Sequence, residues 1–164
     1  MRISSFTSDV GGAAAIEFAF VLPVVIGLIT GTFELGLVAL AANTLDNSVQ
    51  AAARTLRVNE TGAANTNSDF KTKICSGMFE TQATCLSKLN VSVRTFADFA
   101  HARAAGGDAP AGEFSKGTAG DVVMVKATYS WPFFMPFFNL GFQPSGPGSV
   151  LLDERSTFKN EPYT

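Results

Sequence analysis

Residues that build catalytic and metal sites are scarce in this sequence. Its 164 residues include one histidine, His101, and two cysteines, Cys75 and Cys85. Structural zinc sites need about four such ligands at short, regular spacings, so no metal is expected. The sequence also contains no nucleophile elbow, phosphate-binding glycine loop or zinc-binding helix motif. We therefore expect neither an enzyme nor a resident cofactor.

Charged residues are also few, and they are scattered. The chain has 12 Lys and Arg against 14 Asp and Glu, which gives a net charge of −2. A nucleic-acid partner requires basic residues clustered on one face, so none is expected. Before the first apolar run the only basic side chain is Arg2, which Asp9 opposes. The positive-inside rule therefore says little about which side of a membrane the N-terminus occupies.

A long stretch almost without charge dominates the first third of the chain. The segment from Phe18 to Ala42 is 25 residues long, and Glu34 is its only charged side chain. As a helix it would measure about 37 Å, enough to cross a hydrocarbon core of ~30 Å with some tilt. It exceeds the apolar part of a signal peptide, which is about 7–15 residues. The pattern predicts a transmembrane helix over residues 13–42, kinked at Pro23.

The same helix is predicted to continue past the membrane. Residues 43–58 contain no Pro or Gly, and their apolar side chains recur at helical spacing. These side chains are Leu45, Val49, Ala52, Ala53 and Leu56. We expect one helix of about 45 residues, whose first part lies in lipid and whose second part packs on a folded domain.

One face of the predicted membrane helix carries small residues and an acid. It consists of Gly27, Gly31, Glu34 and Val38, which are separated by four, three and four residues. Gly27 and Gly31 form a small-xxx-small pair that allows another helix to approach closely. However, glycine is common in membrane helices, and Glu34 would also fit the outer headgroup layer. The stripe is therefore either an assembly surface or a coincidence of composition.

Both cysteines follow the apolar segment. In an exported domain an even pair indicates one disulfide, whereas two free thiols would be expected in the cytosol. Cys75 and Cys85 are ten residues apart, which is about 15 Å along a straight helix and too far for a bond. A disulfide would need a bend, for which Gly77 is the obvious place. It would stabilise the domain by about 2–3 kcal/mol.

Residues 59–164 predict a small exported domain of the α+β class. A loop over 59–69 precedes helical spacing that starts at Phe70 and is broken at Ser76-Gly77. Three later segments alternate apolar and polar residues as strands do. They are residues 89–94, 121–131 and 150–158, with an irregular segment over 97–120. We expect about three antiparallel strands folded onto the outer half of the long helix.

Residues 132–148 combine bulky apolar side chains with four prolines. The apolar residues are Phe133, Phe134, Met135, Phe137, Phe138, Leu140 and Phe142. The segment is too short and too often interrupted by proline to span a bilayer. It could touch the outer leaflet or a partner, or its rings could cap the core of a small domain. The sequence leaves both possibilities open.

A motif opens the apolar segment. Gly12 is followed by four residues and then by Glu17 and Phe18. This arrangement resembles the processing motif of type IV pilins, particularly of the Flp/Tad branch. The longer run from Gly12 to Pro23, the Phe33–Gly36 segment and the Lys159–Tyr163 tail are similar to TadE-like pseudopilins of the tight-adherence (Tad) system. The similarity covers the N-terminal helix and the last few residues, and it implies a pilin-like fold.

The resemblance implies that a prepilin peptidase cleaves between Gly12 and Ala13, so that residues 1–12 form a leader peptide. Cleavage would free an α-amino group with a pKa of about 8, four residues before Glu17. In a bundle of subunits, the ammonium of one copy could reach Glu17 of the next. Without a partner, a carboxylate within the hydrocarbon costs roughly 2.5–3.5 kcal/mol.

Two other interpretations of this region stay open. Glu17 could sit in the inner headgroup layer and only mark the start of the helix. Alternatively, Ala39-Leu40-Ala41 could be a signal-peptidase site that releases a domain beginning at Ala42.

The resemblance thus implies a minor pilin or pseudopilin that supports biogenesis of a Tad/Flp-type pilus. Its assembly residues would be Glu17, Phe18, Gly27, Gly31 and Glu34. The expected partners are the prepilin peptidase, other pilins, Tad assembly proteins and membrane lipid. The protein would cross the bacterial inner membrane once, with its C-terminal domain in the periplasm, and could enter a surface pilus. The alternative is an uncut helix that tethers a periplasmic binding or scaffold domain.

Overall fold

A computed structural model describes residues 11–106, 110, 112–135, 144–146 and 148–162. The chain forms two compact units, residues 1–37 and 38–164. Helix α1 (Gly11–Arg57) belongs to both units and is a single helix of 47 residues, as the uninterrupted pattern predicted. Helical structure continues through Pro23, and a kink there stays a prediction.

The polar side chains in the apolar part of α1 bond within the helix itself. The hydroxyl of Thr30 donates to the carbonyl oxygen of Ile26 at 2.7 Å, and the hydroxyl of Thr32 donates to that of Leu28 at 2.8 Å. These bonds satisfy hydroxyl groups that would otherwise be costly in a medium without water. The first part of α1 is therefore compatible with a lipid environment.

The second unit contains an antiparallel sheet. Among the described residues it has four strands in the order β1-β2-β4-β3. They are β1 (Leu89–Phe96), β2 (Val122–Pro132), β3 (Pro144–Gly146) and β4 (Ser149–Lys159). The three long strands confirm the predicted antiparallel sheet. The short β3 was not predicted, and it pairs only with Ser149 and Val150 at the start of β4.

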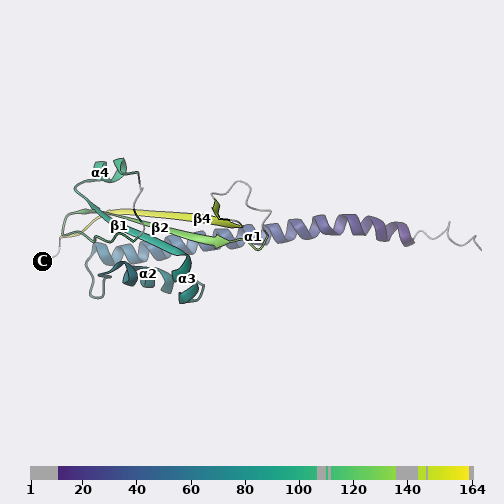
Figure 1. Ribbon diagram of the computed structural model, residues 1–164, viewed down its shortest axis with the longest axis horizontal. Helices are drawn as coiled ribbons and strands as arrows, with labels where there is room; N and C mark the ends of the chain where they lie inside the picture. Colours follow the sequence, from purple (N-terminus) through teal and green to yellow (C-terminus); the bar gives the residue numbers. More distant parts are fainter. Residues whose placement is uncertain (1–10, 107–109, 111, 136–143, 147, 163–164) are drawn as a thin grey trace, which may run out of the picture. The chain divides into compact units, whose positions relative to one another are not determined.

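Within this unit, one face of the sheet and the outer part of α1 share a core (Figure 1). Alternate residues of β2, from Val123 to Trp131, are at most 5% exposed. In the part of α1 that belongs to the second unit, the buried residues are Val38, Ala41, Leu45, Ser48, Val49, Ala52, Ala53 and Leu56. They include the apolar stripe that helical spacing predicted, so this half of the helix packs on the domain. The α+β, pilin-like fold class is thereby confirmed.

Two short helices flank the bend between the cysteines. Helix α2 (Asn67–Ser76) starts at Thr66, whose hydroxyl accepts from the backbone N–H of Asp69 at 3.1 Å. It ends at Gly77, and α3 (Gln82–Lys88) follows after a short turn. The predicted break at Ser76-Gly77 is confirmed. Because the chain turns there, Cys75 and Cys85 come within 5.7 Å between their Cα atoms and form a disulfide.

The segment predicted as irregular contains one helix. This helix, α4 (Phe99–Ala104), is capped by Asp98, whose carboxylate accepts from the backbone N–H of His101 at 2.8 Å. It contacts β1 and β2. Arg155, which alternates with the core-facing residues of β4, donates to the carbonyl oxygen of Gly106 at 3.0 Å. The α4 region therefore covers the sheet face opposite α1.

Candidate assembly site

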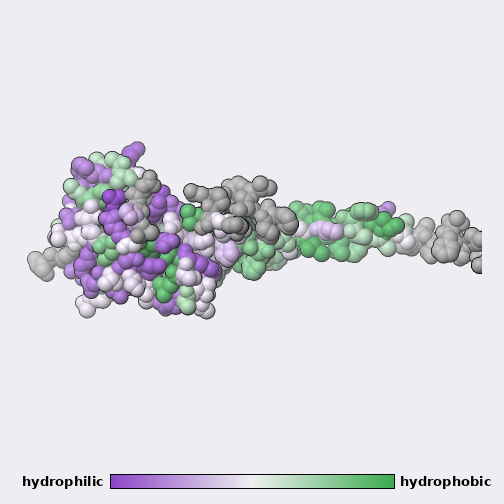
Figure 2. Space-filling model, viewed as in Figure 1, coloured by the Kyte–Doolittle hydropathy of each residue, from purple (hydrophilic) through white to green (hydrophobic). Residues whose placement is uncertain are grey.

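The first unit exposes an apolar helix surface. Among the described residues, α1 is the one helix that is long and apolar enough to cross a membrane. Phe18, Phe20 and Phe33 are 63%, 76% and 71% exposed. Figure 2 shows the hydrophobic colour along this part of α1. Water would solvate so much apolar surface poorly, so lipid or other apolar helices must cover it.

The predicted processing residues lie at the start of this helix. Glu17 and the residues from Gly12 to Phe18 are all exposed. A Cβ atom added to Gly12 would meet no other atom within 4 Å. The fold therefore does not require glycine at this position, and any requirement for Gly12 must come from another molecule. Two glycines in succession, Gly11 and Gly12, also weaken the first turn of the helix.

The predicted stripe of Gly27, Gly31, Glu34 and Val38 is less exposed than the rest of the apolar segment. Gly27 is half-buried and has open space around it, whereas Gly31 is buried. Glu34 is 3% exposed, although its neighbours Phe33 and Leu35 are exposed. A buried carboxylate needs interaction partners, which the lipid chains do not supply. Glu34 has such a partner within the chain, and an assembly role for the stripe stays a prediction.

The C-terminal tail closes the other end of α1. The backbone N–H of Glu161 donates to the carbonyl oxygen of Arg57 at 3.0 Å, and its carboxylate pairs with the Arg57 guanidinium at 2.8 Å. One of the last carbonyls of the helix thereby gains a donor. The buried amide of Asn160 donates to the carbonyl oxygens of Lys116 and Thr118 at 2.9 and 3.1 Å. Sequence reasoning noted this tail only as a resemblance and missed its structural role.

A polar cluster beneath the disulfide-linked turn was also missed. The Tyr129 hydroxyl donates to the carboxylate of Glu80, and the Lys88 ammonium donates to the same carboxylate at 2.9 Å. Burial, together with the adjacent Glu80 carboxylate, raises the pKa of Tyr129. Lys88 also lies 5.8 Å from the centre of the Trp131 ring. The cluster holds the α2–α3 turn against β2. The spacing of these residues in the sequence does not predict the cluster.

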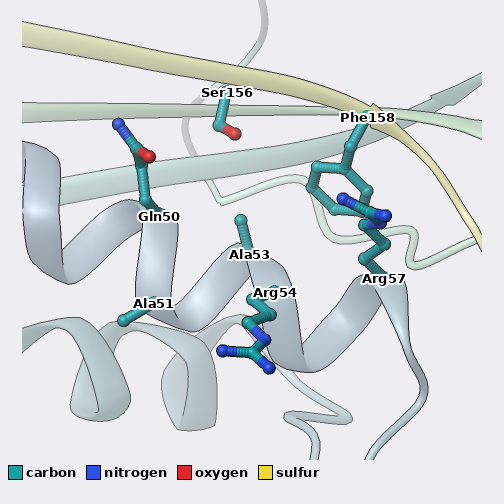
Figure 3. Close-up of a pocket in the computed structure, with 7 residues that line it drawn as sticks. All are labelled: Gln50, Ala51, Ala53, Arg54, Arg57, Ser156 and Phe158. Carbon is teal, nitrogen blue, oxygen red and sulfur yellow. The ribbon is translucent and has the colours of Figure 1, made fainter.

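An open groove of about 380 Å³ lies between the end of α1 and β4 (Figure 3). Its lining consists of Gln50, Ala51, Ala53, Arg54, Arg57, Ser156 and Phe158. The Arg57 side chain points toward Phe158, whereas the Arg54 guanidinium points away from β4. This lining contains no carboxylate, histidine or cysteine. It therefore offers positive charge and apolar surface to a partner and no general acid–base pair.

Two further carboxylates of the domain, those of Asp98 and Asp121, have structural partners. The Asp98 carboxylate accepts from the backbone and ring nitrogens of His101, which lowers the pKa of Asp98. Backbone and hydroxyl donors of Thr118 likewise lower the pKa of Asp121. Within the part of the chain that the structure describes, no three His, Cys, Asp or Glu side chains are placed to hold a metal ion.

Comparison with known proteins identifies the N-terminal part of the chain. The family model of TadE-like proteins matches residues 12–54. No curated protein and no solved structure matches the chain. The matched residues make up most of helix α1, which is long and apolar enough to cross a membrane. Residues 12–54 are therefore a TadE-like segment, as the motifs of the sequence predicted.

Proposed function

We propose that this protein is a minor pilin or pseudopilin that supports biogenesis of a Tad/Flp-type pilus. The observation that carries the proposal is the exposed apolar helix of the first unit, which begins with Gly12 and Glu17 within the TadE-like segment. Its role is structural, because assembly needs a helix that other helices can cover and no chemistry on a substrate. These exposed residues do not pack in the core of the fold, so their identity is free to serve assembly.

Maturation would cut the peptide bond between Gly12 and Ala13. A prepilin peptidase at the cytoplasmic face would remove residues 1–12 and leave the α-ammonium of Ala13 at the start of α1. Gly12 has open space around it, so the fold does not require a glycine here, which supports recognition by a peptidase. The new ammonium lies one helical turn before Glu17. In a bundle it would pair with Glu17 of a neighbouring subunit, with Phe18 beside it.

Assembly would proceed by lateral packing of these helices. Lipid chains and leucine side chains are similarly apolar, so close packing and polar contacts must favour the bundle. Of the predicted stripe, Gly27 has open space around it and would allow another helix to approach closely, whereas Gly31 and Glu34 are already buried within the subunit itself. Other pilins and Tad assembly proteins would be the partners, and membrane lipid would surround the stored subunit.

The location would be the bacterial inner membrane, crossed once, with the C-terminal domain in the periplasm. The disulfide between Cys75 and Cys85 supports this side, because disulfides persist in oxidising compartments such as the periplasm. The subunit could then stay at the base of the pilus or enter the filament.

The alternative is an uncut helix that tethers a periplasmic binding or scaffold domain. The groove between α1 and β4 is the feature that would serve such a domain. This alternative gives Gly12 no role, and it leaves the Glu17 carboxylate without the ammonium that cleavage supplies.

The mass of the protein purified from its native membrane tests the proposal. Loss of the first twelve residues supports the pilin, a chain that starts at Met1 supports the tether, and a start near Ala42 would indicate ordinary secretion. Gly12→Val should abolish trimming. The matched control is Gly11→Val, which should leave trimming intact because five residues separate Gly11 from Glu17. Equal trimming of both variants would overturn the assigned cleavage site.

A further inference from the structure

The two ends of the second unit differ in chemistry. The end where α1 and β4 terminate carries charge, with Arg54, Arg57, Glu161 and Lys159. The other end is where α1 enters the unit at Val38, and α1 carries no charged side chain from Leu35 to Leu45.

Four aromatic side chains gather at the apolar end. The Asp46 carboxylate of α1 acts electrostatically on Glu154 of β4, and Glu161 bonds to Arg57, so β4 and α1 run in the same direction. Four residues of β4 before Glu154 span about 14 Å, which equals roughly nine residues of helix. Val150 therefore lies near the level of Val38, together with Trp131, its partner on β2.

We call this cluster the aromatic rim, and it consists of Phe79, Trp131, Phe133 and Phe134. The ring of Phe79 packs edge-on against that of Trp131, with 5.7 Å between the ring centres. Phe134 follows shortly after the end of β2. Trp131 and Phe133 are buried, but Phe79 is 49% and Phe134 is 80% exposed. The rim thus has a buried base and two exposed rings.

We propose that the aromatic rim contacts the lipid surface, with Phe79 and Phe134 in the headgroup layer of the outer leaflet. Val38, near whose level the rim lies, belongs to the predicted membrane span of residues 13–42, so the rim lies beside the end of that span within the second unit. Exposed apolar rings, including those of phenylalanine, gain free energy when they are buried at the boundary between lipid headgroups and acyl chains. Lys88 and Glu80 beside the rim pair with each other, so no uncompensated charge has to enter this layer.

This inference rests on α1 spanning a bilayer, but not on cleavage at Gly12 or on entry into a pilus. It assigns the rim a second task besides capping the core. The lipid surface would hold the domain at a fixed height and tilt above the membrane, and thereby orient the groove for other subunits. A subunit partner on the rim is the competing possibility, and the experiment below distinguishes the two.

The test uses the full chain in vesicles of phosphatidylcholine and phosphatidylglycerol, with or without brominated acyl chains. Trp131 is the only tryptophan, so Trp131→Phe provides a background without tryptophan emission. New probes are introduced singly as Phe134→Trp and Phe79→Trp. The matched control is Phe99→Trp on α4, a phenylalanine that is 53% exposed on the opposite face of the sheet. Phe20→Trp in α1 shows whether the helix inserts.

We expect brominated lipid to quench the probes at positions 134 and 79 and to shift their emission to shorter wavelength, whereas the probe at 99 stays unquenched. Quenching at 20 with none at 134 and 79 would overturn the inference and leave the anchor intact. If aqueous iodide also fails to reach those two probes, a subunit covers the rim, which overturns it as well. No quenching at 20 would overturn the anchor itself and the inference with it.

A spin label on Phe134→Cys keeps the test independent of the Trp131 substitution. The wild-type cysteines are joined, so the new thiol is the one that reacts. The label should be more accessible to oxygen than to a water-soluble nickel complex, and the reverse result would contradict the proposal.

Discussion

Replacing Gly77 with alanine tests how closely the end of α2 packs against α1. Gly77 follows α2 and has a φ of −91°, which alanine adopts without strain. However, an added Cβ atom would lie 2.5 Å from the Ser48 hydroxyl oxygen and 3.2 Å from the Ser48 Cβ atom. Ser48 is on the buried face of α1 and is 7% exposed. The new methyl group must therefore displace the Ser48 side chain or push the end of α2 and α1 apart.

The expected cost is that of overpacking a buried contact. Such changes typically cost about 1–3 kcal/mol, and a reduced entropy of the unfolded chain offsets about 0.4–1 kcal/mol. For a domain of this size, each kcal/mol lowers Tm by roughly 3–5 °C. With central values of about 2 and 0.7 kcal/mol the net cost is about 1.3 kcal/mol. Gly77→Ala should therefore lower Tm by about 4–7 °C, measured by circular dichroism on the full chain in detergent micelles.

A double-mutant cycle isolates the contact with Ser48. Ser48→Ala removes the hydroxyl oxygen and leaves only the longer Cβ contact. Gly77→Ala should consequently cost much less in the Ser48→Ala background than in the wild type. If the loss is the same in both backgrounds, or if Gly77→Ala leaves Tm unchanged, α1 does not pack on the end of α2 as described.

Three further changes test the domain by the same unfolding measurement. Cys75→Ser should cost about 2.8 kcal/mol on the loop-entropy view and should make Tm insensitive to reductant, and a remaining reductant effect would contradict the single disulfide. Asn160→Ala should lower the free energy of unfolding by about 1–3 kcal/mol, because its buried amide donates to two carbonyl oxygens. Glu161→Ala should lower it by no more than about 1 kcal/mol, because its ion pair with Arg57 is half-exposed. A larger loss for Glu161→Ala than for Asn160→Ala would refute the assigned roles. Burial and the charge of Asp46 raise the pKa of Glu154, so its ionisation disfavours folding as pH rises. Glu154→Gln should therefore raise Tm at neutral pH and leave it unchanged below about pH 4, and a Tm gain that persists in acid would contradict this.

Local pattern determined most of the fold. The long helix followed from an apolar run that continued into a helical stripe without Gly or Pro between Ala39 and Val58. The strands followed from strict alternation, most clearly in β2. The bend that allows the disulfide followed from the distance that a straight helix would impose on Cys75 and Cys85.

The missed elements depend on short or non-local signals. Helix α4 has only six residues. Its one local signal is Asp98, which caps the helix by accepting from the backbone N–H of His101, and a single capping residue does not predict a helix in an Ala-rich segment. β3 is three residues long and begins with a proline, which argues against a strand.

The candidate site was predictable only along α1. Gly12, Glu17 and the Gly27–Glu34 stripe lie within one helix, where spacing alone places them. The bonds between Glu161 and Arg57 join residues 104 positions apart, and those between Tyr129 and Glu80 join residues 49 apart. Such pairs appear only once the fold is known. Of the aromatic segment, residues 136–143 and 147 lie outside the described residues, while Phe133 is buried and Phe134 exposed.

The most direct test of the proposed mechanism is the number of surface fibres on cells whose subunit carries Glu17→Ala. The account predicts that this subunit is trimmed and stays in the membrane, yet no longer supports fibres at the wild-type level, because the liberated Ala13 ammonium has lost its carboxylate partner. Trimmed, retained Glu17→Ala subunits that give full fibre numbers would contradict it.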